Sequence, residues 1–191
     1  MATSTHEEQL YKIFNNVNDW LKFAEAKNFG LLSINAAVIL GFLQIPFAEN
    51  SNYEKVSNWI IPIFTFLSFF PCILSLFPIV SRIEKREMIR SWIDTFSNWI
   101  DAETKFENIH FYGYLKDIDD VEFQKKFIEK KELNVTTDKF NQFEIELVSQ
   151  ILYNSRITWL KYQLFKIGAF VFLFGIVVLY PLILLIIKLF S

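Results

Sequence analysis

The sequence contains one cysteine, Cys72, so an intramolecular disulfide and a cysteine-based zinc site are both excluded. Small secreted domains that are stabilised by disulfide bonds contain several cysteines, so this chain does not resemble them. Glycine and proline are also scarce, with 5 of each in 191 residues. Because turns depend on these two residues, their scarcity favours long helices over many short strands. The net charge is −2, which indicates no polyanionic partner such as a nucleic-acid polymer.

The common catalytic motifs are missing as well. The chain has no glycine-rich phosphate loop, no HExxH zinc motif and no GxSxG nucleophile motif. Its two histidines, His6 and His110, are too few for a histidine-rich metal cluster. Neighbouring carboxylates such as Glu144 and Glu146 are explained by a solvated polar surface. We therefore expect a protein that is not an enzyme and that holds neither a metal nor a cofactor.

Charged residues are absent from three apolar runs, residues 28–48, 56–81 and 167–187. Each run is at least about 20 residues, the length that a helix needs to cross the hydrocarbon of a bilayer. Buried helices of a soluble protein explain the runs less well, because 52% of the residues are hydrophobic and 22 are Phe. A retained hairpin explains the first two runs better than a signal peptide, because a polar segment precedes them. We therefore expect three transmembrane helices without an intramembrane charge for proton transfer.

The lysines and arginines beside these runs predict a topology, because positive charge favours the cytoplasmic side. They gather before the first run, after the second and before the third, whereas the loop 49–55 has one lysine. The N-terminus and residues 82–166 are therefore expected in the cytoplasm, and Ser191 on the other side. The charges that carry this argument are Lys12, Lys22, Lys27, Arg82, Lys85, Arg86, Arg90, Arg156, Lys161 and Lys166.

The segments outside the spans have the spacing of amphipathic helices. Over residues 1–27, apolar side chains recur every three or four residues, as on one face of a helix. Similar spacing follows the second run and precedes the third, with Gly113 as a break before a short charged helix over residues 121–133. The sequence thus predicts an all-α membrane protein whose three transmembrane helices are continuous with a cytoplasmic helical bundle.

The stretch FAEAKNFGLLSIN, which begins at Phe23, joins a polar helix to the first span. Its small residues would let another helix approach closely, and Asn35 is a strong hydrogen-bonding group. Two explanations stay open at this point. The stretch could couple the polar helix to the span, or Lys27 could simply snorkel to the interface while Asn35 packs between helices.

Two later stretches combine groups that could bind a nucleotide. NIHFYGY, residues 108–114, contains an amide, an imidazole and three aromatic rings, which can read the edges of a base and stack on it. A helix-ending turn with core aromatics is the competing explanation. SRITWLKYQLFK, residues 155–166, carries three cations, which could contact a phosphate or lipid headgroups.

Together these stretches resemble the Pycsar transmembrane effectors (PycTM-like proteins). The first is similar to that family's pattern A-D-x-K-A-x-x-L-L-x-x-N, and the second to N-x-x-F-F-G-H. ELVSQILYNSRITWLKYQLFKIGAF is similar to a last helix of the form Q-x-x-x-x-S-x-x-x-x-x-K-Y. This sequence departs from the pattern at Glu25, where Asp is usual, at Asn28, where a small residue is common, and at Tyr114, where His is expected. The matching positions are Ala24, Glu25, Lys27, Leu31, Leu32, Asn35, Asn108, Phe111, Tyr112, Gly113, Gln150, Lys161 and Tyr162.

The resemblance implies an antiphage effector in the inner membrane of a bacterium. In that family a cyclase answers infection by making a cyclic nucleotide, a cyclic pyrimidine monophosphate in the Pycsar case. The effector then impairs the inner membrane and stops the cell before the phage can spread. The implied ligand is cyclic UMP or cyclic CMP, and the implied sensing region is residues 82–166.

This resemblance and the chemistry of the side chains together select candidate residues. Coupling to the membrane is expected from Glu25, Lys27 and Asn35. A homo-oligomer is expected, because three spans of one protomer enclose no obvious pore. A ligand-independent pore-forming toxin and a membrane-anchored scaffold for a protein partner stay open as alternatives. The expected ligand contacts are Asn108, His110, Tyr112, Arg156 and Lys161.

Overall fold

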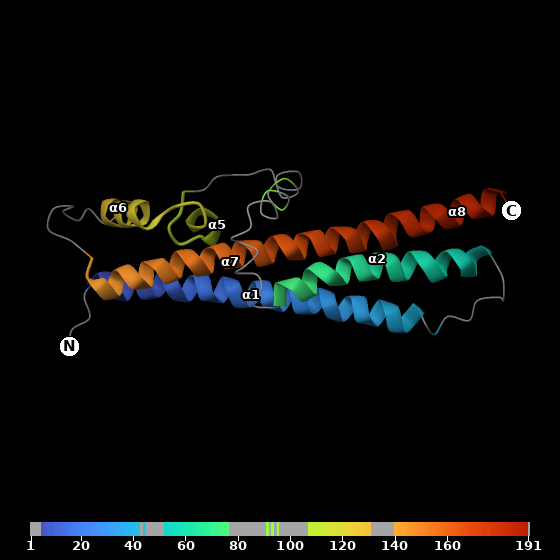
Figure 1. Cartoon of the computed structure of the whole chain (residues 1–191), viewed down its shortest axis with the longest axis horizontal. Helices are drawn as coiled ribbons and strands as arrows, with labels where there is room; N and C mark the ends of the chain where they lie inside the picture. Colours follow the sequence, from blue (N-terminus) through green and yellow to red (C-terminus); the bar gives the residue numbers. More distant parts are fainter. Residues whose placement is uncertain are drawn as a thin grey trace. The chain divides into compact units, whose positions relative to one another are not determined.

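All regular secondary structure is helical in the residues that the structure, a computed structural model, describes: 5–42, 44, 52–76, 91, 93, 95, 107–130 and 140–190. Two long helices come first, α1 (Thr5–Phe42) and α2 (Asn52–Leu76). Two short helices follow, α5 (Tyr112–Leu115) and α6 (Asp120–Lys130). The last long helix, α7 (Gln142–Leu173), continues through a π-helical segment, η1 (Phe174–Leu179), into α8 (Tyr180–Phe190) (Figure 1).

Three stretches of helix are long and apolar enough to cross a membrane: α1, α2, and the continuous run from α7 into α8. This confirms the predicted class, an all-α protein with three long apolar helices. The structure begins α2 at Asn52, inside the expected loop 49–55. The charged helix expected over residues 121–133 corresponds to α6. The helix expected after the second span lies outside the described residues, apart from single positions such as Ile93.

The chain divides into two compact units. The first unit consists of Met1–Ala24 and Ser81–Tyr162, and the second, here called the spanning unit, of Glu25–Val80 and Gln163–Ser191. Both α1 and α7 supply residues to each unit. Two helices of this protein, α1 and α7, are therefore shared between an amphipathic part and an apolar part.

Buried positions recur every seven residues along each long helix. A seven-residue period keeps one stripe of a helix against its neighbours, and it is the period of left-handed helical bundles. The stripe in α1 is apolar, whereas those in α2 and α7 contain polar and very small residues. The members are Leu10, Val17, Ala24 and Leu31 in α1, Ile61, Ser68 and Ser75 in α2, and Lys161, Gly168 and Gly175 in α7 and η1.

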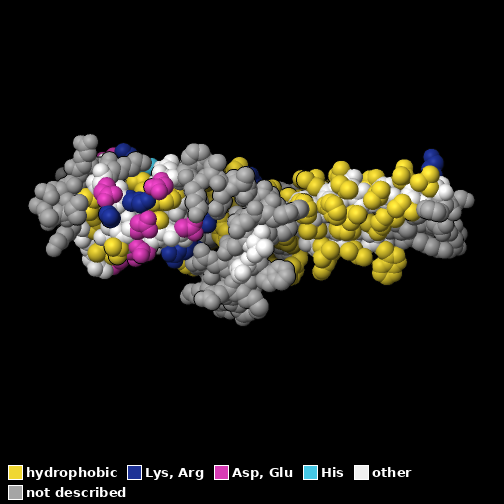
Figure 2. Space-filling view, turned by 90° about the horizontal axis from the view of Figure 1, so that it is seen from above, with side chains coloured by type: hydrophobic (Ala, Val, Ile, Leu, Met, Phe, Trp, Pro, Cys, Tyr) yellow, Lys and Arg dark blue, Asp and Glu magenta, His cyan; other side chains and the backbone are white. Residues whose placement is uncertain are grey.

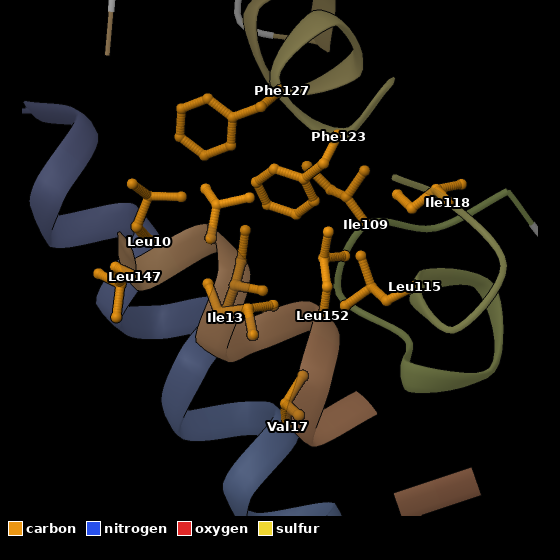
Figure 3. Packing of buried hydrophobic residues seen from close by; sticks show 12 residues of the cluster. Leu10, Ile13, Val17, Ile109, Leu115, Ile118, Phe123, Phe127, Leu147 and Leu152 are labelled. Carbon is orange, nitrogen blue, oxygen red and sulfur yellow. The ribbon is translucent and has the colours of Figure 1, made fainter. Parts of the chain in front are cut away.

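The core of the first unit is assembled by α1, α6, α7 and the segment around α5 (Figure 3). Phe123 and Phe127 lie one turn apart on α6, and both are fully buried. Burying a phenylalanine side chain stabilises a fold by roughly 1.5–3 kcal/mol. The predicted apolar face of residues 1–27 supplies the α1 side of this core. The other members are Leu10, Ile13, Val17, Ile109, Leu115, Ile118, Leu147, Val148, Ile151 and Leu152.

A capping box starts α7. The Asn141 side-chain oxygen accepts a hydrogen bond from the Glu144 N–H, and Glu144 Oε2 accepts one from the Asn141 N–H, both at 2.8 Å. These bonds satisfy two backbone donors that the first turn of a helix leaves without a partner. Glu144 is consequently only 2% exposed. The expectation that Glu144 belongs to a solvated surface is therefore wrong, because the helix terminus needs its carboxylate.

In the spanning unit, α2 runs opposite to α1 and to the chain from α7 into α8 (Figure 1). The outer surface of the spanning unit carries exposed apolar side chains, such as Phe66, Phe70 and Val177. On the face shown in Figure 2, this unit is almost entirely hydrophobic, whereas the charged side chains gather on the other unit. Such a surface is matched to lipid rather than to water.

Proline explains the π-helical segment. Pro181 has no backbone N–H, and inside a helix its ring meets the carbonyl four residues earlier, here that of Val177. The wider turn of η1 covers this position and gives the carbonyl room. In α2, Pro62 and Pro71 also lie within the helix. Transmembrane helices tolerate proline where side chains and neighbouring helices satisfy the freed backbone groups.

Candidate functional site

The segment before α5 is a tight turn fixed by Asn108. The Asn108 side-chain oxygen accepts a hydrogen bond from the His110 N–H at 2.9 Å, and its carbonyl accepts one from the Phe111 N–H at 2.9 Å. Asparagine suits this place because its short amide can bond the backbone two residues on. Ile109 anchors the turn in the core, and Asn16 of α1 donates to the His110 carbonyl.

The rings of Phe111 and Tyr112, which follow this turn, belong to an aromatic cluster. The cluster consists of Trp20, Phe23, Phe111, Tyr112 and Tyr162. The rings of Tyr112 and Tyr162 are nearly parallel, with centroids 5.2 Å apart and planes 9° apart. Trp20 lies 5.6 Å from Tyr112 and 6.4 Å from Tyr162. Phe111 lies 4.8 Å from Tyr112, and Phe23 lies 6.4 Å from Tyr162. The cluster thus joins α1, α5 and α7 within the first unit.

Gly113 lies against the ring of Phe111. A Cβ atom at this position would overlap the Phe111 side chain. The residue lies inside the single turn of α5, so the sequence-based view of Gly113 as a break in the chain is wrong. It is small because the preceding aromatic ring folds back over it, and that fold brings Phe111 into the aromatic cluster.

Three cations of the first unit lie on α7 and at the end of α5: Arg156, Lys161 and Lys116. The half-buried Arg156 donates from Nε to the Lys116 carbonyl at 3.4 Å and from Nη2 to the Ile118 carbonyl at 3.5 Å. These distances are at the long end of hydrogen bonding, so each bond is weak. Lys116 places its ammonium group 4.7 Å above the Trp159 ring. Lys161, next to the cluster residue Tyr162 in the sequence, is only 7% exposed.

Tyr114, which stands where the resemblance expects histidine, is half-buried and packs against the core of the first unit. The Lys126 ammonium lies 4.8 Å above the Tyr114 ring and 3.1 Å from a Glu107 oxygen. The Tyr114 side chain and the Glu107 carboxylate raise the pKa of Lys126 above its ordinary value. Tyr114 therefore packs between the core and Lys126, which is a structural role.

In the spanning unit, Asn35 connects the three helices. It is fully buried, and its amide nitrogen donates to the Ser68 hydroxyl at 3.0 Å. Ser68 in turn donates to the Gly168 carbonyl at 2.9 Å. A Cβ atom on Gly168 would lie 3.0 Å from the Ser68 carbonyl, so the helices approach as closely as glycine allows. Nearby, the Lys27 ammonium lies 5.5 Å from the centre of the Phe165 ring.

A family profile described as the Pycsar effector protein domain, PycTM, matches residues 9–188. The chain belongs to the Pycsar effector family. Neither a curated protein nor a solved structure matched the chain. The match covers the whole aromatic cluster and nearly all of both units and of the three candidate spans. This confirms the resemblance seen in the three short stretches. PycTM is a membrane effector domain that is not known as an enzyme, and Pycsar effectors respond to cyclic nucleotides.

The structure of this Pycsar effector places the expected ligand contacts in the first unit. Tyr112 is in the aromatic cluster, and Asn108 and His110 form the turn before it. Arg156 holds the chain after α5, and Lys161 is on the buried stripe of α7. Of the expected coupling residues, Asn35 packs between helices, Lys27 meets an aromatic ring, and Glu25 begins the spanning unit.

Sequence reasoning left Trp20 and Phe23 out of the candidate site. In the sequence, Trp20 is one more apolar residue of the amphipathic segment 1–27, yet in the structure it contacts four rings of the cluster. The spacing of Trp20 and Phe23, one turn apart on a helix that leads into the membrane, was the available signal. Tyr162 matches the family pattern but is not among the expected ligand contacts.

Proposed function

We propose that this Pycsar effector binds a cyclic pyrimidine monophosphate at the aromatic cluster and then impairs the inner membrane. The observation that carries the proposal is the parallel pair of Tyr112 and Tyr162, with Trp20 beside both. Aromatic faces bind bases by stacking, which is worth about 1–3 kcal/mol per base. Phe23 is 49% exposed, and Trp20 and Tyr112 are half-buried, so the cluster reaches the surface of its unit.

Cations on the same elements support binding of a phosphate. Arg156 and Lys161 belong to α7, which also carries Tyr162. A phosphate oxygen offers a guanidinium group shorter, charge-assisted bonds than the backbone carbonyls that Arg156 now contacts at 3.4 and 3.5 Å. The Asn108 amide and the His110 imidazole would supply polar contacts to a pyrimidine edge.

The response would pass along helices that belong to both units. A ligand shifts a conformational equilibrium only if it binds one arrangement better than the other. Because α1 and α7 supply residues to each unit, a ligand that changes their packing in the first unit acts on the spanning unit through continuous backbone. Glu25, Lys27 and Asn35 would be the coupling residues. The N-terminus would be cytoplasmic, and copies of the chain would assemble into a homo-oligomer.

The decisive experiment is a binding screen with the full-length protein in detergent. Thermal unfolding is followed with cyclic UMP, cyclic CMP, cyclic purine monophosphates and cyclic oligonucleotides, with linear UMP and CMP as matched controls. A ligand present at 100 times its Kd stabilises the folded state by about 2.7 kcal/mol, so a selective ligand raises the Tm. Failure of every cyclic nucleotide to raise the Tm would contradict the proposal.

Two rival functions make different predictions in cells. A ligand-independent pore-forming toxin should depolarise the membrane when it is expressed alone. A membrane-anchored scaffold should never depolarise it. The proposed effector should depolarise the membrane only when its cognate cyclase is active or when the cyclic nucleotide is supplied.

A further inference from the structure

The spanning unit is apolar outside and polar inside. Its buried positions include Asn35, Ser68 and Ser75, all of them fully buried, whereas Phe66, which lies two residues from Ser68, is 68% exposed. Lipid-facing helices need no polar interior to be stable, because each helix satisfies its own backbone. A polar interior therefore calls for a separate explanation. We use the name polar seam for the buried set Asn28, Asn35, Thr65, Ser68, Cys72, Ser75 and Gly168.

The polar seam is closed by a chain of hydrogen bonds. Asn35 donates to Ser68, and Ser68 donates to the Gly168 carbonyl, so that α1, α2 and α7 are tied at one level. Thr65 and Cys72 instead donate to carbonyls one turn back in their own helix, those of Ile61 and Ser68. The two bonds that tie the helices at this level therefore share the hydroxyl of Ser68.

Two buried atoms of the seam lack a partner. The side-chain oxygen of Asn35 and the hydroxyl of Ser75 are fully buried, and neither makes a hydrogen bond within the part of the chain that the structure describes. Buried polar atoms that lack a partner are costly, and the cost disappears when water reaches them. Because the Asn35 amide nitrogen is bound to Ser68, its oxygen belongs to the interior of the seam and does not face lipid. Both atoms are suited to water or to a cation, which amide and hydroxyl oxygens bind.

We propose that the polar seam becomes the wall of an aqueous path that carries water and small monovalent ions when the effector is active. This deepens the proposed function and depends on it. Opening requires loss of the bonds from Asn35 to Ser68 and from Ser68 to Gly168. A small rotation of α2 accomplishes both and turns its stripe of Ser68, Cys72 and Ser75 toward water. In a homo-oligomer, the seams of several copies would surround one path.

The chemistry of the seam predicts what it conducts. Its side chains offer amide, hydroxyl and thiol groups, and it carries no formal charge. Carbonyl and hydroxyl oxygens replace the hydration shell of a cation better than that of an anion. The path should therefore pass potassium and sodium with a weak preference over chloride, and it should exclude large metabolites.

Cys72 provides a direct test in the native chain. It is the sole cysteine of the sequence, it is fully buried, and it lies one turn beyond Ser68 on the seam. The full-length protein is reconstituted in potassium-loaded vesicles and treated with 2-(trimethylammonium)ethyl methanethiosulfonate, a charged reagent that does not cross lipid. The reagent reacts with a thiolate, and a thiolate forms only where water has access. Labelling and potassium leak are measured together, with and without cyclic UMP or cyclic CMP.

Two variants serve as controls. Cys72→Ser should remove all labelling, which shows that the signal comes from the seam. Ile63→Cys, made in the Cys72→Ser background, places a thiol on the lipid-facing side of α2, where the native Ile63 is 48% exposed. That thiol should stay unlabelled in both states, because surface exposure in this unit means contact with lipid. Ser75→Cys in the same background should be labelled only in the active state.

The possible outcomes test the polar seam and the proposed function separately. If nucleotide causes leak, raises the labelling rate of Cys72 by at least about tenfold, and labelling then blocks the leak, the seam lines the path. Leak without labelling of Cys72 or of Ser75→Cys overturns the seam while the proposed function stands. Absence of leak with both nucleotides overturns the proposed function, and the aqueous path is overturned with it.

Discussion

The rings of Tyr112 and Tyr162 are nearly parallel, with centroids 5.2 Å apart, although 50 positions separate the two residues in the sequence. Their helices, α5 and α7, also differ in length, since α5 is a single turn of 4 residues. A one-turn helix has little stability of its own. The stack with Tyr162 therefore acts together with the contacts of Tyr112 to Trp20 and Phe111 in positioning α5 against α7.

The first prediction concerns this pair. Tyr112→Leu should weaken binding of the cyclic nucleotide by about tenfold or more, because stacking on one ring is worth about 1–3 kcal/mol. Tyr112→Phe should keep most of the affinity, since the ring face remains. Isothermal titration of the purified variants measures both effects. Tyr153→Leu is the matched control, because Tyr153 is on α7 but is 41% exposed and outside the cluster. Equal affinity of Tyr112→Leu and Tyr153→Leu would place the ligand elsewhere.

A second prediction concerns Gly113. An alanine at this position would overlap the Phe111 ring and push it out of the aromatic cluster. Overpacking of this kind costs about 1–3 kcal/mol, so Gly113→Ala should lower the Tm of the protein and weaken nucleotide binding. Gly30→Ala is the control, because a Cβ there meets nothing within 4 Å. If Phe111→Ala restores the Tm of Gly113→Ala, the ring is the cause; an unchanged Tm in Gly113→Ala would refute the clash.

The helical class and the three spans could be predicted because they depend on local properties. Runs without charge, such as residues 28–48, and three-and-four spacing, as in Leu10, Ile13 and Val17, are visible in the sequence itself. Their physical causes, the cost of charge in lipid and the geometry of the helix, act within a single segment. The turn chemistry of Asn108 is local in the same way, and a turn with core aromatics is one of the two explanations that the sequence leaves open for this segment.

Other features depend on residues far apart in the sequence and were not predicted. The contact of Trp20 with Tyr112 and Tyr162 is one example, because no spacing rule connects these positions. Glu144 was assigned to a solvated surface because its capping role depends on Asn141 starting a helix there. The hydrogen-bond partner of Asn35 could not be predicted for the same reason. An asparagine within a span indicates that a partner exists, but only the packing of the helices shows that the partner is Ser68.

A third prediction tests coupling through Asn35. Asn35→Leu removes the amide that donates to Ser68 and fills its place with an apolar side chain. Because Asn35 belongs to the spanning unit, this variant should bind the cyclic nucleotide with unchanged affinity. It should produce little or no potassium leak, because the apolar leucine replaces a polar group in the wall of the path, and this loss outweighs the easier separation of α1 from α2. Vesicle leak and nucleotide binding are measured on the same preparation. The adjacent Ile34→Leu is the control, since Ile34 is 52% exposed. Full leak from Asn35→Leu would exclude Asn35 from both coupling and the polar seam.

The last prediction concerns the close approach of α2 and η1 in the spanning unit. A Cβ atom on Gly175 would overlap the side chain of Phe64, so Gly175→Ala should destabilise the protein by about 1–3 kcal/mol. Phe64→Ala opens space at this position, and the alanine at 175 then fits. The two substitutions should therefore be coupled by about 0.5–3 kcal/mol. The double variant should lose less stability than the two single variants lose together.

Thermal unfolding of the four proteins of this double-mutant cycle in one detergent measures the coupling. Gly41→Ala is the matched glycine control, because a Cβ there has nothing within 4 Å. It should leave the Tm nearly unchanged or raise it slightly, since alanine favours helix more than glycine does. Additive effects of Gly175→Ala and Phe64→Ala would mean that the two residues do not touch. In that case η1 would pack differently on α2, and its π-helical turn would not bring Gly175 against that helix.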